Sequence, residues 1–147
     1  MKIRPAIVIR DKDTILMMRY SYSGKDVFQF PGGNMEDVET LEQTLARELK
    51  EELNLPVSVE HLLLSAQVIN HKKQQATLHC LFAGSTLQSA RPVLNPQETS
   101  ALEVVWINID QLDQLNLYPS VGNALKEILL HNKATPQYLG AIEQPWF

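Results

Sequence analysis

Cysteine is nearly missing from this chain of 147 residues, which contains only Cys80. One cysteine cannot form an intrachain disulfide, so a small secreted scaffold held by disulfides is excluded. The cysteine content therefore indicates a reducing compartment, and we expect the protein to be cytoplasmic.

Long apolar runs and an excess of basic residues are also missing. No stretch approaches the roughly 18 consecutive apolar residues that a membrane-spanning helix needs. Near the N-terminus, Lys2 and Arg4 lead into a short alternating segment, which is not the pattern of a signal peptide. The net charge of −4 argues against a protein that coats nucleic acid. We therefore expect neither a membrane nor a nucleic-acid polymer as a partner.

What is present is an ordinary globular composition. Hydrophobic residues make up 44% of the chain and charged residues 20%, with no repeats, linkers or low-complexity tracts. This length is sufficient for a hydrophobic core. We predict that residues 1–147 form a single domain.

The hydrophobic pattern changes between strand and helix periods along the chain. Amphipathic helices are predicted over residues 40–53, with Pro56 beyond the end, and over 119–131, with Pro119 in the first turn. A short helical turn is expected over 110–115 and an irregular tail over 132–147. This order predicts the α+β class. Strands are predicted over 2–9 and 14–20 (a hairpin), 27–30, 57–70 and 76–83 (a second hairpin), and 103–108.

Charge is unevenly distributed along the chain. Residues 1–25 contain six basic and two acidic side chains, whereas residues 36–60 contain eight acidic and two basic ones. An acidic metal site opposite a basic segment would suit a polyphosphate substrate bridged by metal. Two solvated faces of opposite charge are the alternative interpretation.

Three carboxylates share one face of the first predicted helix. Glu48, Glu51 and Glu52 fall at i, i+3 and i+4, within an arc of about 100°. Carboxylates this close raise each other's pKa unless a cation lies between them, and ligand sets made only of oxygen suit Mg²⁺ or Mn²⁺ rather than zinc. A solvated acidic helix is the alternative for this run alone. The stripe expected to be buried consists of Leu41, Leu45, Leu49 and Leu53.

A longer pattern surrounds these acids. From Gly33 it passes five residues to Glu39 and then seven more to the segment Arg47–Leu55, RELKEELNL. This pattern resembles the Nudix box, G-x5-E-x7-R-E-U-x-E-E-x-G-U with U aliphatic, at eight of its nine specified positions. Asn54 occupies the place of the family's second glycine, and Asn is the next most tolerant residue for a left-handed helix C-cap.

The resemblance implies a Nudix-type α/β/α sandwich, with a mixed β-sheet between helices. It also implies a hydrolase that uses Mg²⁺, with Mn²⁺ as a substitute, to cleave the pyrophosphate linkage of a nucleoside diphosphate derivative. That substrate is a small molecule, either a nucleoside triphosphate or a nucleoside diphosphate linked to another group. Two subfamily signals are missing: Asn70 stands where some ADP-ribose hydrolases carry proline, and none of His71, Lys72 and Lys73 supplies the tyrosine that some dinucleoside polyphosphate hydrolases carry nearby.

The resemblance also assigns roles to residues. Glu48 and Glu52 are implied as the principal metal ligands, Glu51 as a further or water-mediated ligand, and a carbonyl near Gly32 as another. Arg47 and Glu39 are implied as an orienting pair that holds the helix against the glycine turn. The general base is either Glu48 or an acid on a distant loop, for which Glu98 is the first candidate and Glu103 the second.

Substrate contacts are less specific. Arg4, Arg19 and Lys25 could reach phosphates, and Tyr20, Tyr22 and Phe28 could stack on a base, although ordinary packing or solvation explains each of them too. The four histidines show no ligand spacing and receive no role. Trp146 and Phe147 are expected to pack on the domain or on a second copy, which leaves a homodimer open.

Two other classes of function compete with the hydrolase. A catalytically silent Nudix-fold module that binds nucleotides or regulates would have lost acids of the box, and all of them are present here. A structural domain with a solvated acidic helix would not need the fixed spacing that begins at Gly33.

Overall fold

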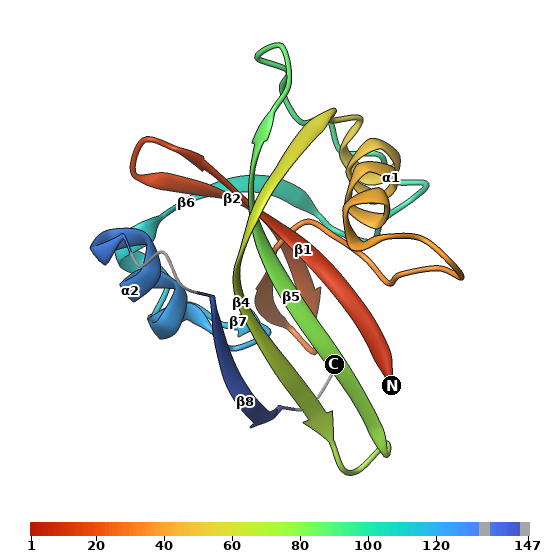
Figure 1. The fold of residues 1–147 in the computed structure, drawn as a ribbon, viewed down its shortest axis with the longest axis vertical. Helices are drawn as coiled ribbons and strands as arrows, with labels where there is room; N and C mark the ends of the chain where they lie inside the picture. The colour runs from red at the N-terminus through yellow and green to blue at the C-terminus, as the bar shows by residue number, and fades with distance from the viewer. Residues whose placement is uncertain (133–135, 145–147) are drawn as a thin grey trace.

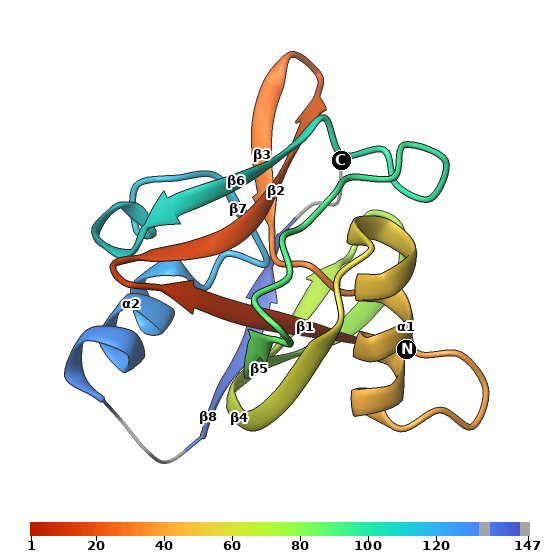
Figure 2. The same ribbon diagram turned by 90° about the horizontal axis from the view of Figure 1, so that it is seen from above.

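The computed structural model describes residues 1–132 and 136–144. Within these residues the chain forms a mixed β-sheet with one α-helix on each side, so the predicted α/β/α sandwich of the α+β class is confirmed. The helices are α1 (Leu41–Leu53) and α2 (Gly122–His131), and both views show them on opposite sides of the strands (Figures 1 and 2). The strands are β1 (Lys2–Asp11), β2 (Thr14–Tyr22), β3 (Lys25–Gln29), β4 (Val57–Asn70), β5 (Gln75–Thr86), β6 (Glu103–Asn108), β7 (Leu117–Tyr118) and β8 (Gln137–Glu143), with a short 3-10 helix η1 (Ile109–Gln111).

The sheet is joined at one corner and diverges from there. Strand β1 pairs with β2 only through Arg10↔Ile15 and Asp11↔Thr14. The remainder of β1 pairs in parallel with β5, which continues through β4 to β8. Strands β3, β6 and β7 belong to the β2 side. The N-terminal half of β1 therefore leaves β2 and faces the space between the two parts of the sheet.

Alternation along β1 sends its side chains to two hydrophobic clusters. Ile7 and Ile9 pack with the buried leucines of α1, which include Leu49 at 1% exposure. Ala6 and Val8 point to the opposite face, where Leu125 and Ile128 of α2 cover them. Strand β1 is thus the shared support of both helices.

The first hairpin and the C-terminal third differ from the prediction. The 2–9/14–20 hairpin is present but contributes only the corner pairs, because β1 pairs mainly with β5. The second helix begins at Gly122, so placing Pro119 in its first turn was wrong: Leu117 and Tyr118 form a strand beside β3.

The irregular tail was also predicted wrongly, since β8 pairs in parallel with β4. Such pairing depends on a distant strand and leaves no local signal. Trp146 and Phe147 lie outside the described residues. No described helix has the length and apolar character required to cross a membrane.

Local capping explains the ends of α1. The Thr40 side chain accepts a hydrogen bond from the Gln43 backbone N–H, and the Gln43 side chain accepts from the Thr40 backbone N–H, which is a capping box. At the other end Asn54 adopts the left-handed conformation, with φ 48° and ψ 42°, and its N–H donates to the carbonyls of Leu49 and Lys50. The predicted role of Asn54 as a C-cap in place of glycine is confirmed.

Replacing Asn54 tests this cap. Asn54→Ala should lower the free energy of unfolding by about 1–2 kcal/mol, because alanine is strained in the left-handed region. Asn54→Gly should not carry this penalty. Denaturant titration of both variants measures the difference, and equal stabilities for the Ala and Gly variants would contradict the assignment.

Candidate active site

The Pro31–Gly33 turn brings three elements together. The Pro31 carbonyl accepts a hydrogen bond from Ile7 N–H at 2.8 Å, and Gly33 N–H donates to the Pro5 carbonyl at 3.3 Å. A Cβ at position 32 would overlap the backbone of β1, and one at position 33 would overlap the Glu48 carboxyl. Glycine is therefore required at position 32, where backbone is the neighbour, while a side chain at position 33 would displace the Glu48 carboxyl.

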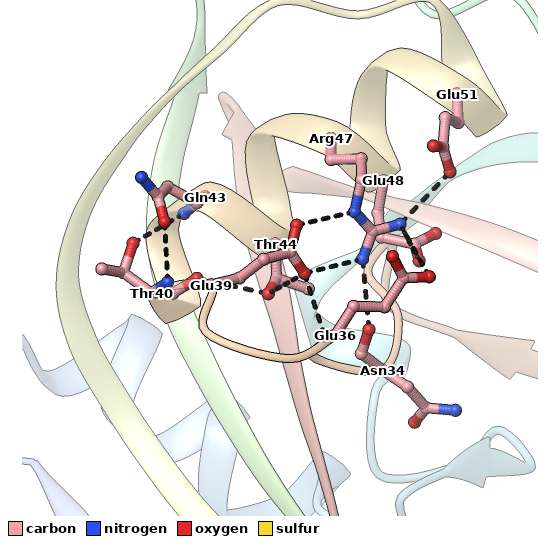
Figure 3. A network of polar contacts seen from close by, with 9 residues as sticks. All are labelled: Asn34, Glu36, Glu39, Thr40, Gln43, Thr44, Arg47, Glu48 and Glu51. Atoms are coloured by element: carbon pink, nitrogen blue, oxygen red, sulfur yellow. Dashed lines mark hydrogen bonds and ion pairs between the residues drawn. The ribbon is translucent and has the colours of Figure 1, made fainter.

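Arg47 is the centre of the polar network in Figure 3. Its guanidinium donates to both carboxylate oxygens of Glu39, with Nε–Oε2 at 2.8 Å and Nη2–Oε1 at 3.0 Å. It also donates to the Asn34 carbonyl at 3.2 Å, to Glu48 Oε1 at 3.0 Å and to Glu51 Oε2 at 3.3 Å. The predicted Arg47–Glu39 pair is present, and the same guanidinium also holds two of the three clustered acids.

Glu39 is bound as a carboxylate. Besides Arg47 it accepts hydrogen bonds from the Glu36 backbone N–H at 2.9 Å and the Thr44 hydroxyl at 3.1 Å. The Arg47 hydrogen bonds, followed by that backbone N–H, lower its pKa from 4.5 to about 2. The loop before α1 is therefore fastened to the helix through a charged group.

Glu48 and Glu52 form a carboxyl pair that lacks sufficient positive charge. The Glu48 side chain is 14% exposed. Burial raises the pKa of Glu52, and a hydrogen bond with Glu48 together with the Glu48 charge raises it further. Arg47 donates to Glu48 but not, among the described contacts, to Glu52. A cation between the two carboxyls would remove this conflict.

The donor chemistry fits a hard divalent cation, although the three acids do not converge on one point. Among the described residues, no group of three or more His, Cys, Asp or Glu side chains is arranged to hold a metal ion. The reason is that Glu51 turns toward Arg47. Glu48 and Glu52 therefore offer a two-carboxylate site, and Glu51 would have to leave Arg47 or act through water to join it.

A long loop brings a fourth acid to the site. The loop between β5 and β6 is fixed to the end of α1, since Asn95 N–H donates to the Glu52 carbonyl and Val93 N–H to the Leu53 carbonyl, both at 2.8 Å. The hydroxyls of Thr99 and Tyr20 are also hydrogen-bonded to each other, 3.3 Å apart. Glu98 is exposed and lines the same groove as Glu52, whereas Glu103 is bound to Arg19 at 2.7 Å and does not line it.

These groups line one open groove with a volume of about 440 Å³. Arg4, Tyr20 and Tyr22 lie along it, so three of the six suggested substrate contacts are at the site. Arg19 instead pairs with Asp26 and Glu103, and neither Lys25 nor Phe28 lines the groove. The sequence-predicted site residues that it brings together are Gly32, Arg47, Glu48, Glu51, Glu52 and Glu98, with Glu39 behind Arg47.

Two buried polar residues near the groove were missed. Gln29 lines it and is 3% exposed, and His79 lies in an adjoining cavity at 0% exposure. Gln29 ends a short strand and carries no motif. His79 has a weak signal, because it interrupts the apolar segment ATLHCLFA at a position where a strand buries its side chains.

Comparison with known proteins adds independent findings. The NUDIX domain family model matches residues 2–128. No curated protein sequence matches the chain. The E. coli ORF135 protein has a similar solution structure, with 21% identity, a TM-score of 0.72, and coverage of 91% of this chain and 94% of that one.

Two crystal structures share the fold. The NUDIX hydrolase from Nitrosomonas europaea is 22% identical, with a TM-score of 0.72 and coverage of 97% of this chain and 79% of that one. An ADP-ribose pyrophosphatase from Streptococcus suis is 17% identical, with a TM-score of 0.68 and coverage of 93% and 98%. At these identities the structural likeness shows the fold alone.

The Arg47–Glu39 pair predicts an acid-dependent stability. Because the pKa of Glu39 in the folded state lies at about 2, below its ordinary value of 4.5, the stabilisation is complete above about pH 4.5 and is lost as the pH falls toward 2. Glu39→Gln should therefore melt at a lower temperature than the wild type at neutral pH, and the gap should close between about pH 5 and pH 2.

Thermal melts across this pH range measure the gap. Glu42→Gln is the matched control, since it removes one acid from the exposed first turn of the same helix and Glu42 has no contact with Arg47 among the described residues. A Glu39→Gln deficit that stays constant with pH would show that the carboxylate charge is not what fastens the loop.

Proposed function

The chain belongs to the NUDIX family, and from this premise we propose that it is a divalent-metal-dependent pyrophosphohydrolase that cleaves the diphosphate linkage of a nucleoside diphosphate derivative. The observation that carries the proposal is the Glu48–Glu52 carboxyl pair, which Gly33 and Arg47 hold in place beside an open polar groove. A divalent cation that these carboxylates hold could bridge them to an anionic substrate.

Mg²⁺ or Mn²⁺, when bound, would neutralise charge on the diphosphate and make a nearby water more acidic. Glu48 and Glu52 would hold the ion, with a carbonyl of the Gly32–Gly33 turn and Glu51 as additional oxygen donors. Arg47 keeps Glu48 oriented and compensates the acids that face away from the ion. Arg4 lines the same groove as these acids and would bind a phosphate oxygen.

Glu98 is our candidate for the general base. Glu48 already accepts a hydrogen bond from Arg47 and contacts Glu52, so its carboxylate is less free to accept a proton from water. Glu98 lines the groove from the β5–β6 loop, and this loop is anchored to the carbonyl of Glu52. A carboxylate in this position can accept a proton from a water that attacks phosphorus.

The substrate class is a small nucleotide. The groove is open and polar and is lined by Arg4 and Arg47 as well as by its acids, which suits a nucleoside triphosphate or a nucleoside diphosphate linked to another group. The fold neighbour described as an ADP-ribose pyrophosphatase belongs to the second class. A silent nucleotide-binding module is the alternative, and the complete set of box acids disfavours it.

The decisive experiment measures phosphate and pyrophosphate release from a panel of nucleotides, with Mg²⁺ and with EDTA. Glu52→Gln should remain folded, because it removes one like-charge contact, while turnover with Mg²⁺ should fall by roughly a thousandfold or more. Glu42→Gln, in the exposed first turn, is the control and should retain wild-type rates. Wild-type turnover in Glu52→Gln would overturn the proposal.

Glu98→Gln tests the choice of base. Its kcat should fall by roughly a hundredfold or more, while the apparent affinity for Mg²⁺ remains close to that of the wild type, because Glu98 does not hold the ion. Glu48→Gln should instead weaken Mg²⁺ binding. Near-normal kcat in Glu98→Gln together with a large loss in Glu48→Gln would move the role of base to Glu48.

A further inference from the structure

The β5–β6 loop binds the C-terminal end of α1. The last carbonyls of a helix have no partner inside the helix. Here the Glu52 carbonyl accepts a hydrogen bond from Asn95 N–H, and the Leu53 carbonyl accepts one from Val93 N–H, both at 2.8 Å. Glu52 also lines the groove, so the loop is attached to the backbone of a residue that would hold the metal.

Asn95 begins a single turn of the chain that contains Glu98. The Asn95 carbonyl accepts hydrogen bonds from Glu98 N–H at 3.0 Å and from Thr99 N–H at 3.2 Å. Its side-chain Oδ1 accepts a third hydrogen bond, from Gln97 N–H at 3.1 Å. Pro96 suits the turn, because it has no N–H to satisfy and its φ is fixed by the ring. Asn95 therefore binds every backbone N–H group over residues 97–99.

The sequence of this turn, NPQE, has the pattern of a capping box. In a complete box the carboxylate of the fourth residue accepts a hydrogen bond from the N–H of the first, and α1 forms both halves through Thr40 and Gln43. In the loop the second half is missing, because Asn95 N–H donates to the Glu52 carbonyl instead. No described hydrogen bond or ion pair involves the Glu98 carboxylate, which is therefore available to a water in the groove.

Beyond Glu98 the loop is fixed by other contacts. Ala101 is 6% exposed and packs in the hydrophobic cluster beside α1. The Thr99 hydroxyl accepts a hydrogen bond from Ala101 N–H at 3.2 Å and is bonded to the Tyr20 hydroxyl. Residues 96–98 are exposed, and Asn95 supplies all of their described hydrogen bonds. The position of Glu98 therefore depends on Asn95 more than on packing.

We propose that Asn95 is a positioning residue, which holds the Glu98 carboxylate at the groove in a fixed place relative to Glu52. Asn95 itself does not line the groove, so it acts through Glu98. Asparagine suits this role, because its amide oxygen accepts from the N–H two residues on without adding a negative charge beside the acids. This inference rests on the proposed function, because it explains how the candidate base is brought to the attacking water.

Asn95→Ala removes the acceptor for Gln97 N–H and tests the proposal with Mg²⁺ and the best nucleotide of the panel. Its kcat should fall by about tenfold to a hundredfold, because a misplacement of about 1 Å can cost a hundredfold in rate. KM and the apparent affinity for Mg²⁺ should stay close to those of the wild type. Asn108→Ala is the matched control, since the Asn108 side chain accepts from the Asp110 backbone N–H at 3.0 Å, away from the groove. Wild-type kcat in Asn95→Ala would overturn the proposal.

Two further comparisons separate positioning from a merely structural role. Asn95→Asp keeps the acceptor and should restore most of kcat at a pH where carboxyl groups are ionised, and Asn95→Ser, whose hydroxyl makes a weaker turn, should fall between Asp and Ala. In the Glu98→Gln background, Asn95→Ala should cause little further loss, because the carboxylate that it positions is gone. Losses that multiply in the double variant, or an Asp variant no better than Ala, would overturn the proposal.

Hydrogen exchange of backbone amides separates failure of this inference from failure of the proposed function, since it requires no turnover. Asn95→Ala should speed exchange at Gln97 and Glu98 by about tenfold or more, whereas Asn108→Ala should leave both amides unchanged. Asn95→Ser provides the same readouts if Asn95→Ala does not fold. If exchange responds in this way but no nucleotide is hydrolysed, the proposed function fails while Asn95 still holds the turn. Unchanged exchange in Asn95→Ala would overturn the inference even for an active hydrolase.

Discussion

The Arg47 guanidinium holds together the loop before α1, the helix itself and the acids on the helix face. It donates hydrogen bonds to Glu39, Glu48, Glu51 and the Asn34 carbonyl, so one positive charge is shared among three carboxylates. The negative charge of the site is not balanced, because Arg47 donates no hydrogen bond to Glu52 among the described contacts. Arg47 therefore fixes the geometry of a site that still needs a cation.

The sheet supports this arrangement through β1. Its C-terminal end joins β2, while its middle carries the Pro31–Gly33 turn through hydrogen bonds to Pro5 and Ile7. Toward its N-terminus β1 diverges from β2 but stays paired with β5, and there Arg4 lines the groove. Arg4 therefore lines both the groove and the adjoining cavity that contains His79.

Local signals in the sequence predicted α1, its Asn54 cap and the Arg47–Glu39 pair, because each depends on residues only a few positions apart. They did not predict β7 or β8, whose pairing partners β3 and β4 are distant in the chain. Spacing placed Glu51 on the same helix face as Glu48 and Glu52, but it could not reveal that the Glu51 side chain turns to Arg47. His79 was missed because its position beside Arg4 arises only when β1 and β5 pair.

The central claim is that the Glu48–Glu52 pair holds a divalent cation, and direct titration with Mn²⁺ tests it. The electron paramagnetic resonance signal of free Mn²⁺ should fall saturably as protein is added. Binding near neutral pH should also release protons, since the pKa of Glu52 is raised in the free protein and a metal would displace its proton. A free Mn²⁺ signal that stays undiminished at millimolar protein would contradict the account.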